Sequence, residues 1–295
     1  SITSRGYIKR VSDQAYRRQG RGGRGVIGQS MRGEDEVNYF VRANTLDTIL
    51  FFTDKGKVYS GRVFELPEES RQGRGIPLVN IINLEPEETV TAVLSISDFS
   101  QAKYCALVTR FGRVKRVHIS EFERVRPSGL IAIRLNNNDE VGWAQLTSGQ
   151  DDLILVTRKG KALRFHEKEV RPTGRSTMGV SGIRLRGDDQ VVSMDLVEPG
   201  GFLLVITERG KGKRTPLDEY LAKGRGTLGV TTISQEARAE IGDIVEACVV
   251  QEDEDVTLIT QAGIVLRTKV ADISIQGRAT QGVHIMDLNE GDSLA

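Results

Sequence analysis

The sequence predicts an all-β fold in which six four-stranded antiparallel blades form a propeller-like ring. A Thr-x-x-Gly motif recurs six times, at intervals of 48 to 56 residues. Short apolar runs separated by turns fill each interval, and no long segment has the 3.6-residue period of a helix. Repeats of this length and strand content are typical of a ring of small sheets. The alternatives are a β-solenoid, whose coils are usually shorter, and two separate sandwiches.

The first element of each repeat is a hairpin around the motif. In the fourth repeat an apolar run over 153–157 meets Arg158-Lys159-Gly160, and a second run follows over 161–165. A three-residue turn that ends in Gly fits a hairpin with a G1 bulge, because Gly tolerates a positive φ. The motif glycines are Gly6, Gly56, Gly112, Gly160, Gly210 and Gly263. The predicted repeats cover about 1–48, 49–101, 102–149, 150–199, 200–251 and 252–295.

A glycine-rich segment and an acid-led strand complete each repeat. A second glycine follows the first by 19 residues in five repeats and by 17 in the third. A short apolar segment such as 179–185 comes next, and then a strand that an acidic residue introduces, as at Asp139 and Asp188. Residues 235–241 allow only a short turn of helix. We expect the last sheet to need a strand from the other terminus or from a neighbouring blade.

The composition indicates a globular chain without obvious catalytic equipment. Hydrophobic residues make up 38% and aromatic residues 5%, so Val, Ile and Leu must build the core. Cys105 and Cys248 lie in apolar, strand-like contexts, which predicts buried free thiols. Three widely spaced histidines form no zinc pattern. The sequence has no signal peptide and no apolar run of membrane-spanning length, and because it begins at Ser1 we expect a fragment of a longer protein.

Positive charge is concentrated at the start of the chain. The formal net charge is +1, but residues 1–33 contain eight Arg or Lys and one Asp, which leaves −6 for the other 262 residues. A basic end on a near-neutral chain predicts a focused anion-binding patch.

The centre of this basic end is a glycine-rich segment, Gln19-Gly20-Arg21-Gly22-Gly23-Arg24-Gly25. It aligns with the segments that end at Gly179, Gly229 and Gly282, but Arg24 replaces Met178, Leu228 and Gln281. Glycines let backbone N–H groups approach an anion, and arginines bind phosphate in a bidentate manner. The segment has no group that could abstract a proton or bind a metal, so contact with a phosphate backbone is the chemistry it predicts.

Cations also recur around the motif turns. In a ring, equivalent turns lie on one surface, so these charges would form a belt. A belt without a sequence-reading helix suits duplex DNA that is held by its phosphates and bent. Neutralising about eight phosphates predicts a slope of log K against log salt near −7. The predicted contacts outside the glycine-rich segment are Arg5, Lys9, Arg10, Arg17, Arg18, Lys55, Lys57, Arg74, Arg113, Lys115, Arg116, Lys159, Lys161, Arg164, Arg175, Arg209, Lys211, Lys213 and Arg225.

Over its whole length the chain resembles the C-terminal domains of the DNA gyrase A proteins. That family carries a box, Q-R-R-G-G-K-G, which stands here as the segment 19–25. Gly20 replaces an arginine of the box and Arg24 replaces its lysine, while Arg17 and Arg18 can make up the lost charge.

The resemblance implies a six-bladed β-pinwheel in which neighbouring blades exchange strands and DNA wraps around the outer rim with positive handedness. Such wrapping would bias an ATP-dependent type II topoisomerase toward negative supercoils. The breakage tyrosine, the metal site and the ATPase would lie outside this chain, which would be a non-catalytic, cytoplasmic module without a cofactor. Its partners would be double-stranded DNA, the breakage-reunion part of the gyrase A protein, and the gyrase B protein, with no membrane.

The repeat pattern leaves three other functions open. The C-terminal domain of the topoisomerase IV A protein has a degenerate or missing box and binds DNA without strong wrapping. A propeller that binds protein partners would not require a steep salt dependence. A propeller enzyme is disfavoured, because no cluster of His, Asp or Glu recurs on one loop face. Repeat six has the weakest turn, with Arg267 and Arg278 as its main cations, and is expected to contribute least to DNA binding.

Overall fold

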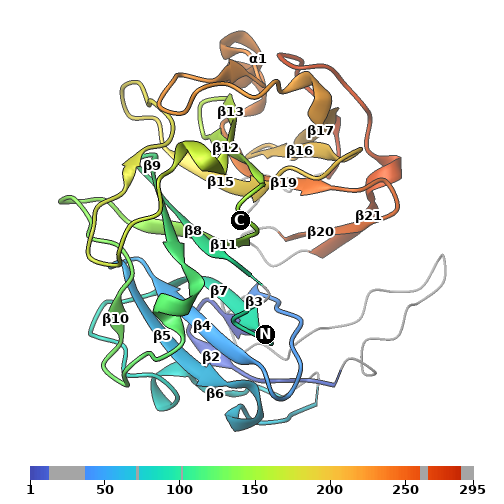
Figure 1. Cartoon of the computed structure of the whole chain (residues 1–295). Helices are drawn as coiled ribbons and strands as arrows, with labels where there is room; N and C mark the ends of the chain where they lie inside the picture. Colours follow the sequence, from blue (N-terminus) through green and yellow to red (C-terminus); the bar gives the residue numbers. More distant parts are fainter. Residues whose placement is uncertain (13–36, 71–72, 101, 260–264, 287–295) are drawn as a thin grey trace. The chain divides into compact units, whose positions relative to one another are not determined.

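The structure is a computed structural model that describes residues 1–12, 37–70, 73–100, 102–259 and 265–286 (Figure 1). The chain forms two compact units: unit 1 comprises residues 1–102 and 119–132, and unit 2 comprises 103–118 and 133–295. Each sheet lies within one unit. The fold class is all-β, as predicted.

The described part of unit 1 contains two four-stranded antiparallel sheets. The first has the order β3-β1-β2-β6, with β1 at Ile2–Thr3, β2 at Tyr7–Ile8, β3 at Val37–Tyr39 and β6 at Ile76–Pro77. The second has the order β10-β5-β4-β7, with β4 at Thr48–Thr53, β5 at Lys57–Arg62, β7 at Val90–Ile96 and β10 at Leu130–Ile131. Among its described residues, this unit also has three 3-10 turns: η2 (Val63–Glu65), η3 (Leu78–Asn80) and η4 (Ile119–Phe122).

Unit 2 contains three four-stranded sheets and, among its described residues, one two-stranded sheet. One sheet has the strand order β11-β8-β9-β14, with β8 at Tyr104–Thr109, β9 at Arg113–His118, β11 at Val141–Thr147 and β14 at Val180–Ser181. The next sheet has the strand order β15-β12-β13-β18, with β12 at Asp152–Thr157, β13 at Lys161–His166, β15 at Val191–Leu196 and β18 at Val230–Thr231. The third sheet has the strand order β19-β16-β17-β22, with β16 at Phe202–Thr207, β17 at Lys211–Pro216, β19 at Ile244–Val250 and β22 at Val283–His284. The last sheet pairs β20 (Asp255–Ile259) with β21 (Val265–Lys269).

Neighbouring repeats exchange strands. In each four-stranded sheet, one edge strand comes from the following repeat. This strand is two residues long and begins directly after the second glycine of that repeat. For example, β18 follows Gly229 and pairs with β13, so that Val230 lies opposite Ala162 and Thr231 opposite Lys161. The same arrangement recurs with β6, β10, β14 and β22. The exchange implied by the resemblance is therefore present.

The motif Thr has a structural role in the hairpin turn. The N–H of Gly160 donates to the carbonyl of Thr157, and the N–H of Lys161 donates to the hydroxyl of Thr157 at 3.1 Å. Gly160 has φ +87°, as a G1 bulge requires. A Cβ there would lie less than 3.0 Å from the carbonyl oxygen of Ile233, so glycine is needed for space as well as for φ. The recurrence of Thr three residues before Gly thus reflects a repeated turn.

Hydrophobic cores lie between successive sheets. In unit 2, Ile154 and Val156 of β12 pack with Leu203 and Val205 of β16, and all four are fully or almost fully buried. Branched aliphatic residues predominate there, as the low aromatic content predicts. The helix α1 (Gln235–Ile241) begins after Ser234, whose hydroxyl accepts from the N–H of Ala237.

Both cysteines are free thiols. Cys105 is buried, and Cys248 is half-buried. Burial raises the pKa of the Cys105 thiol well above its usual range and that of Cys248 to about 12. Neither thiol is activated as a nucleophile.

Candidate nucleic-acid interface

The predicted cations differ in their surroundings: some are buried, most turn cations have partners near the surface, and Arg175 and Arg225 are half-exposed on glycine-rich loops. The segment Gln19–Gly25, with Arg17 and Arg18, lies outside the described residues. The predicted belt includes cations of both units.

Three predicted contacts are buried lysines, and their burial corrects the prediction that they reach DNA. Lys9, Lys115 and Lys213 are at most 1% exposed. Each ammonium group donates to at least one backbone carbonyl in the glycine-rich loop of the following repeat. Lys213 Nζ lies 2.8 Å from the carbonyl oxygen of Gly277, and 2.7 Å from that of Thr232 in its own repeat. Lys115 Nζ binds the carbonyls of Arg175 and Thr177, and Lys9 Nζ binds those of Ser70 and Gly73.

Burial lowers the pKa of two of these lysines. The pKa of Lys213 falls to about 8, because desolvation outweighs the attraction of Glu219. The pKa of Lys9 is also lowered by burial, and Glu69 opposes the change. The three buried ammonium groups are therefore structural, since they bind backbone carbonyls inside the fold.

The arginines four residues after the motif glycine join neighbouring repeats. Arg116 Nε donates to the carbonyl of Val170 at 2.8 Å, while its Nη1 lies 3.0 Å from Glu167 Oε2. Arg116 is 5% exposed, so it too is corrected from a DNA contact to a structural residue. Arg10 and Arg164 are half-buried and bind the carbonyls of Leu66 and of Leu217 and Tyr220, respectively.

Most turn cations are paired at the surface. Lys57 contacts Glu85, Lys159 contacts Asp188, and Lys55 lies 3.4 Å from Asp54. Arg209 donates to the carbonyl of Glu240, Arg113 to those of Met178 and Gly179, and Lys161 to the hydroxyl of Thr231. Arg74 binds the hydroxyl of Tyr7, Lys211 is half-buried, and Arg5 is exposed. Acidic residues beside several turns therefore balance much of the positive charge that a count of basic residues in the sequence assigns to those turns.

The glycine-rich loops of unit 2 are joined to one another by hydrogen bonds and are here called the loop track (residues 174–184, 224–232 and 277–282). Backbone hydrogen bonds join its segments. The N–H of Gly226 donates to the carbonyl of Gly182, and that of Arg184 donates to Thr227 at 2.8 Å. The N–H of Ala279 donates to the carbonyl of Thr232 at 3.0 Å. Loops from three successive repeats therefore share one bonded ribbon.

The loop track carries four arginines on three successive loops, here called the arginine row. Arg184 and Arg278 are exposed, and Arg175 and Arg225 are half-exposed. Arg134 is exposed beside the row, where its N–H donates to the carbonyl of Thr177. The row mixes arginines with glycines that leave backbone accessible, which is suitable for the phosphates of a duplex.

Arg225 differs from the exposed members of this row, because its side chain is already bound to backbone. Its Nε donates to the carbonyl of Glu169 at 2.9 Å, and its Nη1 donates to that of Ser181 at 3.0 Å. Both acceptors are neutral carbonyls, and the backbone N–H of Arg225 donates to the Glu169 carboxylate at 2.9 Å. Arg225 can therefore contribute positive potential to the loop track while it also joins two repeats.

Sequence reasoning found Arg175 and Arg225 but missed Arg134 and Arg184. Both missed arginines stand five residues after the second glycine of their repeats, Gly129 and Gly179. Comparing that position across repeats would have identified them. Their relevance depends on contacts between loops about 45 residues apart in sequence, such as that of Arg134 with Thr177.

The described residues contain no other obvious reactive centre. They include no group of three or more His, Cys, Asp or Glu side chains suited to a metal ion. Among these same ranges, no helix is long and apolar enough to cross a membrane.

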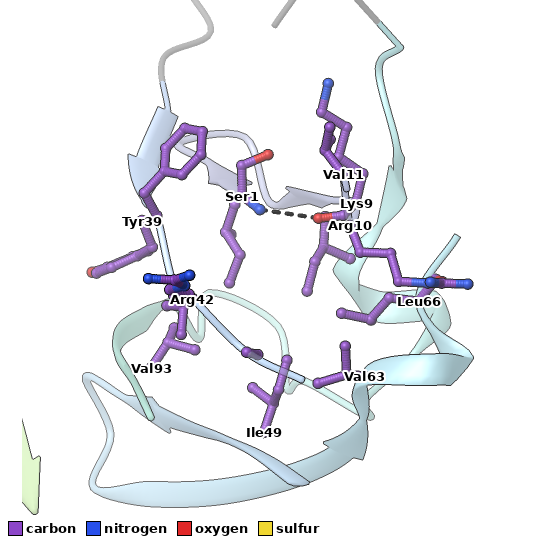
Figure 2. A pocket seen from close by; sticks show the side chains of 15 residues that line it. Ser1, Lys9, Arg10, Val11, Tyr39, Arg42, Ile49, Val63, Leu66 and Val93 are labelled. Carbon is purple, nitrogen blue, oxygen red and sulfur yellow. Dashed lines mark hydrogen bonds between the residues drawn. The ribbon is translucent and has the colours of Figure 1, made fainter. Parts of the chain in front are cut away.

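A cavity of about 310 Å³ lies in unit 1 beside Ser1 and Lys9 (Figure 2). Ile49, Val63 and Val93 contribute apolar walls, and the residues that line it include no carboxylate, histidine or cysteine. The N-terminal amino group of Ser1 donates to the carbonyl of Lys9 at 3.0 Å.

Comparison with known proteins identifies related domains. The family described as "DNA gyrase C-terminal domain, beta-propeller" matches residues 1–44, 47–97, 103–148, 151–198, 201–246 and 254–295. The chain is 50% identical over 295 residues to the DNA gyrase A protein of Halalkalibacterium halodurans and 42% identical over 296 residues to that of Mycolicibacterium smegmatis. All of this chain is aligned in both cases, but it spans only 35% of each relative.

Solved structures show the same architecture. The crystal structure of the C-terminal domain of DNA topoisomerase IV matches with a TM-score of 0.83 and 32% identity, over 99% of this chain and 90% of that one. The structure of a DNA gyrase A C-terminal domain matches with a TM-score of 0.82 and 29% identity, over 99% and 96%. The six matched segments fit the six blades of a β-pinwheel.

Proposed function

The chain belongs to the DNA gyrase C-terminal domain family, and from this premise we propose that it binds duplex DNA by its phosphates and wraps it. The loop track is the observation that carries the proposal. It presents Arg175, Arg184, Arg225 and Arg278 along one hydrogen-bonded ribbon. Arginine forks bind phosphate oxygens without reading bases, so binding would be independent of sequence.

The proposed role within a longer protein is to shape DNA rather than to cut it. Wrapped DNA would present a neighbouring segment for strand passage and so bias a type II topoisomerase toward negative supercoils. The breakage-reunion part of the gyrase A protein and the gyrase B protein would supply strand cleavage and ATP hydrolysis. This chain would act in the cytoplasm without a cofactor.

The salt dependence of duplex binding tests the DNA-binding step. We expect log K to fall steeply with log salt, and Arg184→Gln to reduce the slope by about 1, since one phosphate contact is lost. Lys168→Gln is the control, because Lys168 is exposed but lies outside the loop track. A salt-independent affinity would instead support a protein-binding propeller.

The box 19–25 is tested separately. Arg21→Ala combined with Arg24→Ala should abolish any change in plasmid linking number while the circular dichroism spectrum stays unchanged. A full linking change in that folded variant would remove the box from the proposal.

DNA binding without strong wrapping, as expected of the topoisomerase IV A protein, is the second candidate. The match to the topoisomerase IV domain favours it, because its TM-score is as high as that of the gyrase A domain. Both candidates predict the salt dependence, but only the first predicts a large linking change.

A further inference from the structure

The peptide group that precedes Arg278 is held from both sides. Its carbonyl oxygen, on Gly277, accepts from the buried ammonium of Lys213 at 2.8 Å. Its N–H, on Arg278, donates to Glu219 Oε2 at 3.0 Å. A cation and an anion from the preceding repeat therefore fix one peptide plane. The side chain that leaves this plane, Arg278, is exposed on the loop track.

Lys213 also organises the rest of that loop. Its Nζ binds the hydroxyl of Thr280 at 3.0 Å and the carbonyl of Thr232 at 2.7 Å. Thr232 in turn accepts the N–H of Ala279. One ammonium group thus connects the loop 277–280 with the neighbouring segment of the loop track.

Alternate repeats use different side chains at this position. Lysine stands three residues after the motif glycine in repeats one, three and five, as Lys9, Lys115 and Lys213. Repeat four has Leu163, which is 1% exposed and offers no donor. The loop that covers Leu163 still has the anionic half of the arrangement, since the N–H of Arg225 donates to Glu169 Oε2 at 2.9 Å. The chain therefore contains a natural comparison in which the cationic half is missing.

We propose that Lys115 and Lys213 are positioning residues for DNA binding, each of which fixes a glycine-rich loop from beneath so that the loop's arginine meets phosphate. The proposal rests on the proposed function. Glycine-rich loops have many accessible conformations. A loop that is already ordered loses less conformational entropy when it binds. The ammonium groups would therefore raise affinity without touching DNA.

The test compares Lys213→Met, Arg278→Ala and the double variant in the full 295-residue chain, with a duplex DNA probe. Loss of one phosphate contact should weaken binding about three- to fivefold at moderate salt and reduce the salt slope by about 1. We expect Lys213→Met to approach the effect of Arg278→Ala, and the double variant to bind no more weakly than Arg278→Ala. Leu163→Met, a volume-conserving change at the equivalent position, is the control and should leave affinity unchanged.

A pH series on the unchanged protein keeps the test decisive if Lys213→Met does not fold. Because the pKa of Lys213 is about 8, its ammonium loses its proton above pH 8, whereas arginines stay charged. Affinity should fall about threefold or more between about pH 7 and 9.5 in the wild type and markedly less in Arg278→Ala.

Several outcomes would overturn the inference. Additive losses in the double variant would mean that Lys213 acts independently of Arg278. A folded Lys213→Met protein with wild-type affinity, or a wild-type pH profile equal to that of Arg278→Ala, would also contradict it. Failure of the wild type to bind duplex DNA would instead remove the proposed function itself.

Discussion

At the residue scale, burial separates cations that look alike in the sequence. Lys211 and Lys213 lie two residues apart on β17, yet Lys211 is half-buried and Lys213 is 0% exposed. Part of the cover over Lys213 comes from the following repeat, 64 residues later in the chain. Charge counting could not detect that cover, because it arises only when the repeats pack together.

Glu167 is a second buried charge, and its removal should destabilise unit 2. It is 0% exposed and accepts from the N–H groups of Gly149 and Asp151 as well as from Arg116. Glu167→Ala leaves these donors unpaired, so we expect a loss of about 3–5 kcal/mol in the free energy of unfolding. Urea denaturation measures it. Lys168→Ala, at an exposed neighbour, should change it by less than about 0.5 kcal/mol, and equal effects would refute the role of burial.

The titration of Lys213 predicts the sign of a stability change. Its folded pKa of about 8 lies below the usual value of 10.5, so the unfolded chain holds more protons between these pH values. Stability should therefore rise with pH across this window. Relative to Lys213→Met, the wild type should gain on the order of 3 kcal/mol from about pH 8 to 10.5, measured by urea denaturation. A relative loss would contradict the lowered pKa.

At the element scale, short exchanged strands connect the repeats, and glycines make room for them. The spacing of residues in the sequence predicted the hairpins and showed that a second glycine recurs in each repeat. It could not show why the second glycine recurs, because the reason is a contact with the preceding repeat. At Gly229, φ is +70°, and a Cβ would lie less than 3.0 Å from the carbonyl oxygen of Ala162.

A matched pair of glycines separates backbone strain from lack of space. Gly187 also has a positive φ, +60°, but nothing lies within 4 Å of a Cβ built there. Gly187→Ala should cost about 1 kcal/mol for its left-handed backbone. Gly229→Ala should cost about 2 kcal/mol more, because the backbone of β13 or β18 must also move. Equal losses in thermal denaturation would show that the close approach is unimportant.

At the scale of the whole molecule, the sequence predicted six repeats of an all-β chain correctly, but it only partly predicted the cationic surface. Equivalent turns were expected to supply the charges. Glu85 and Asp188 balance several of them, whereas Arg184 and Arg278 are exposed on the loop track. The spacing of residues shows which positions repeat. The net charge exposed to solvent depends instead on which side chains pair across repeats.

The linking number of a plasmid relaxed by a topoisomerase in the presence of this chain tests most directly whether the chain wraps DNA. A positive wrap predicts that the linking number of the purified plasmid rises in proportion to the bound chain. The account would be contradicted by an unchanged linking number at concentrations where the chain saturates the plasmid.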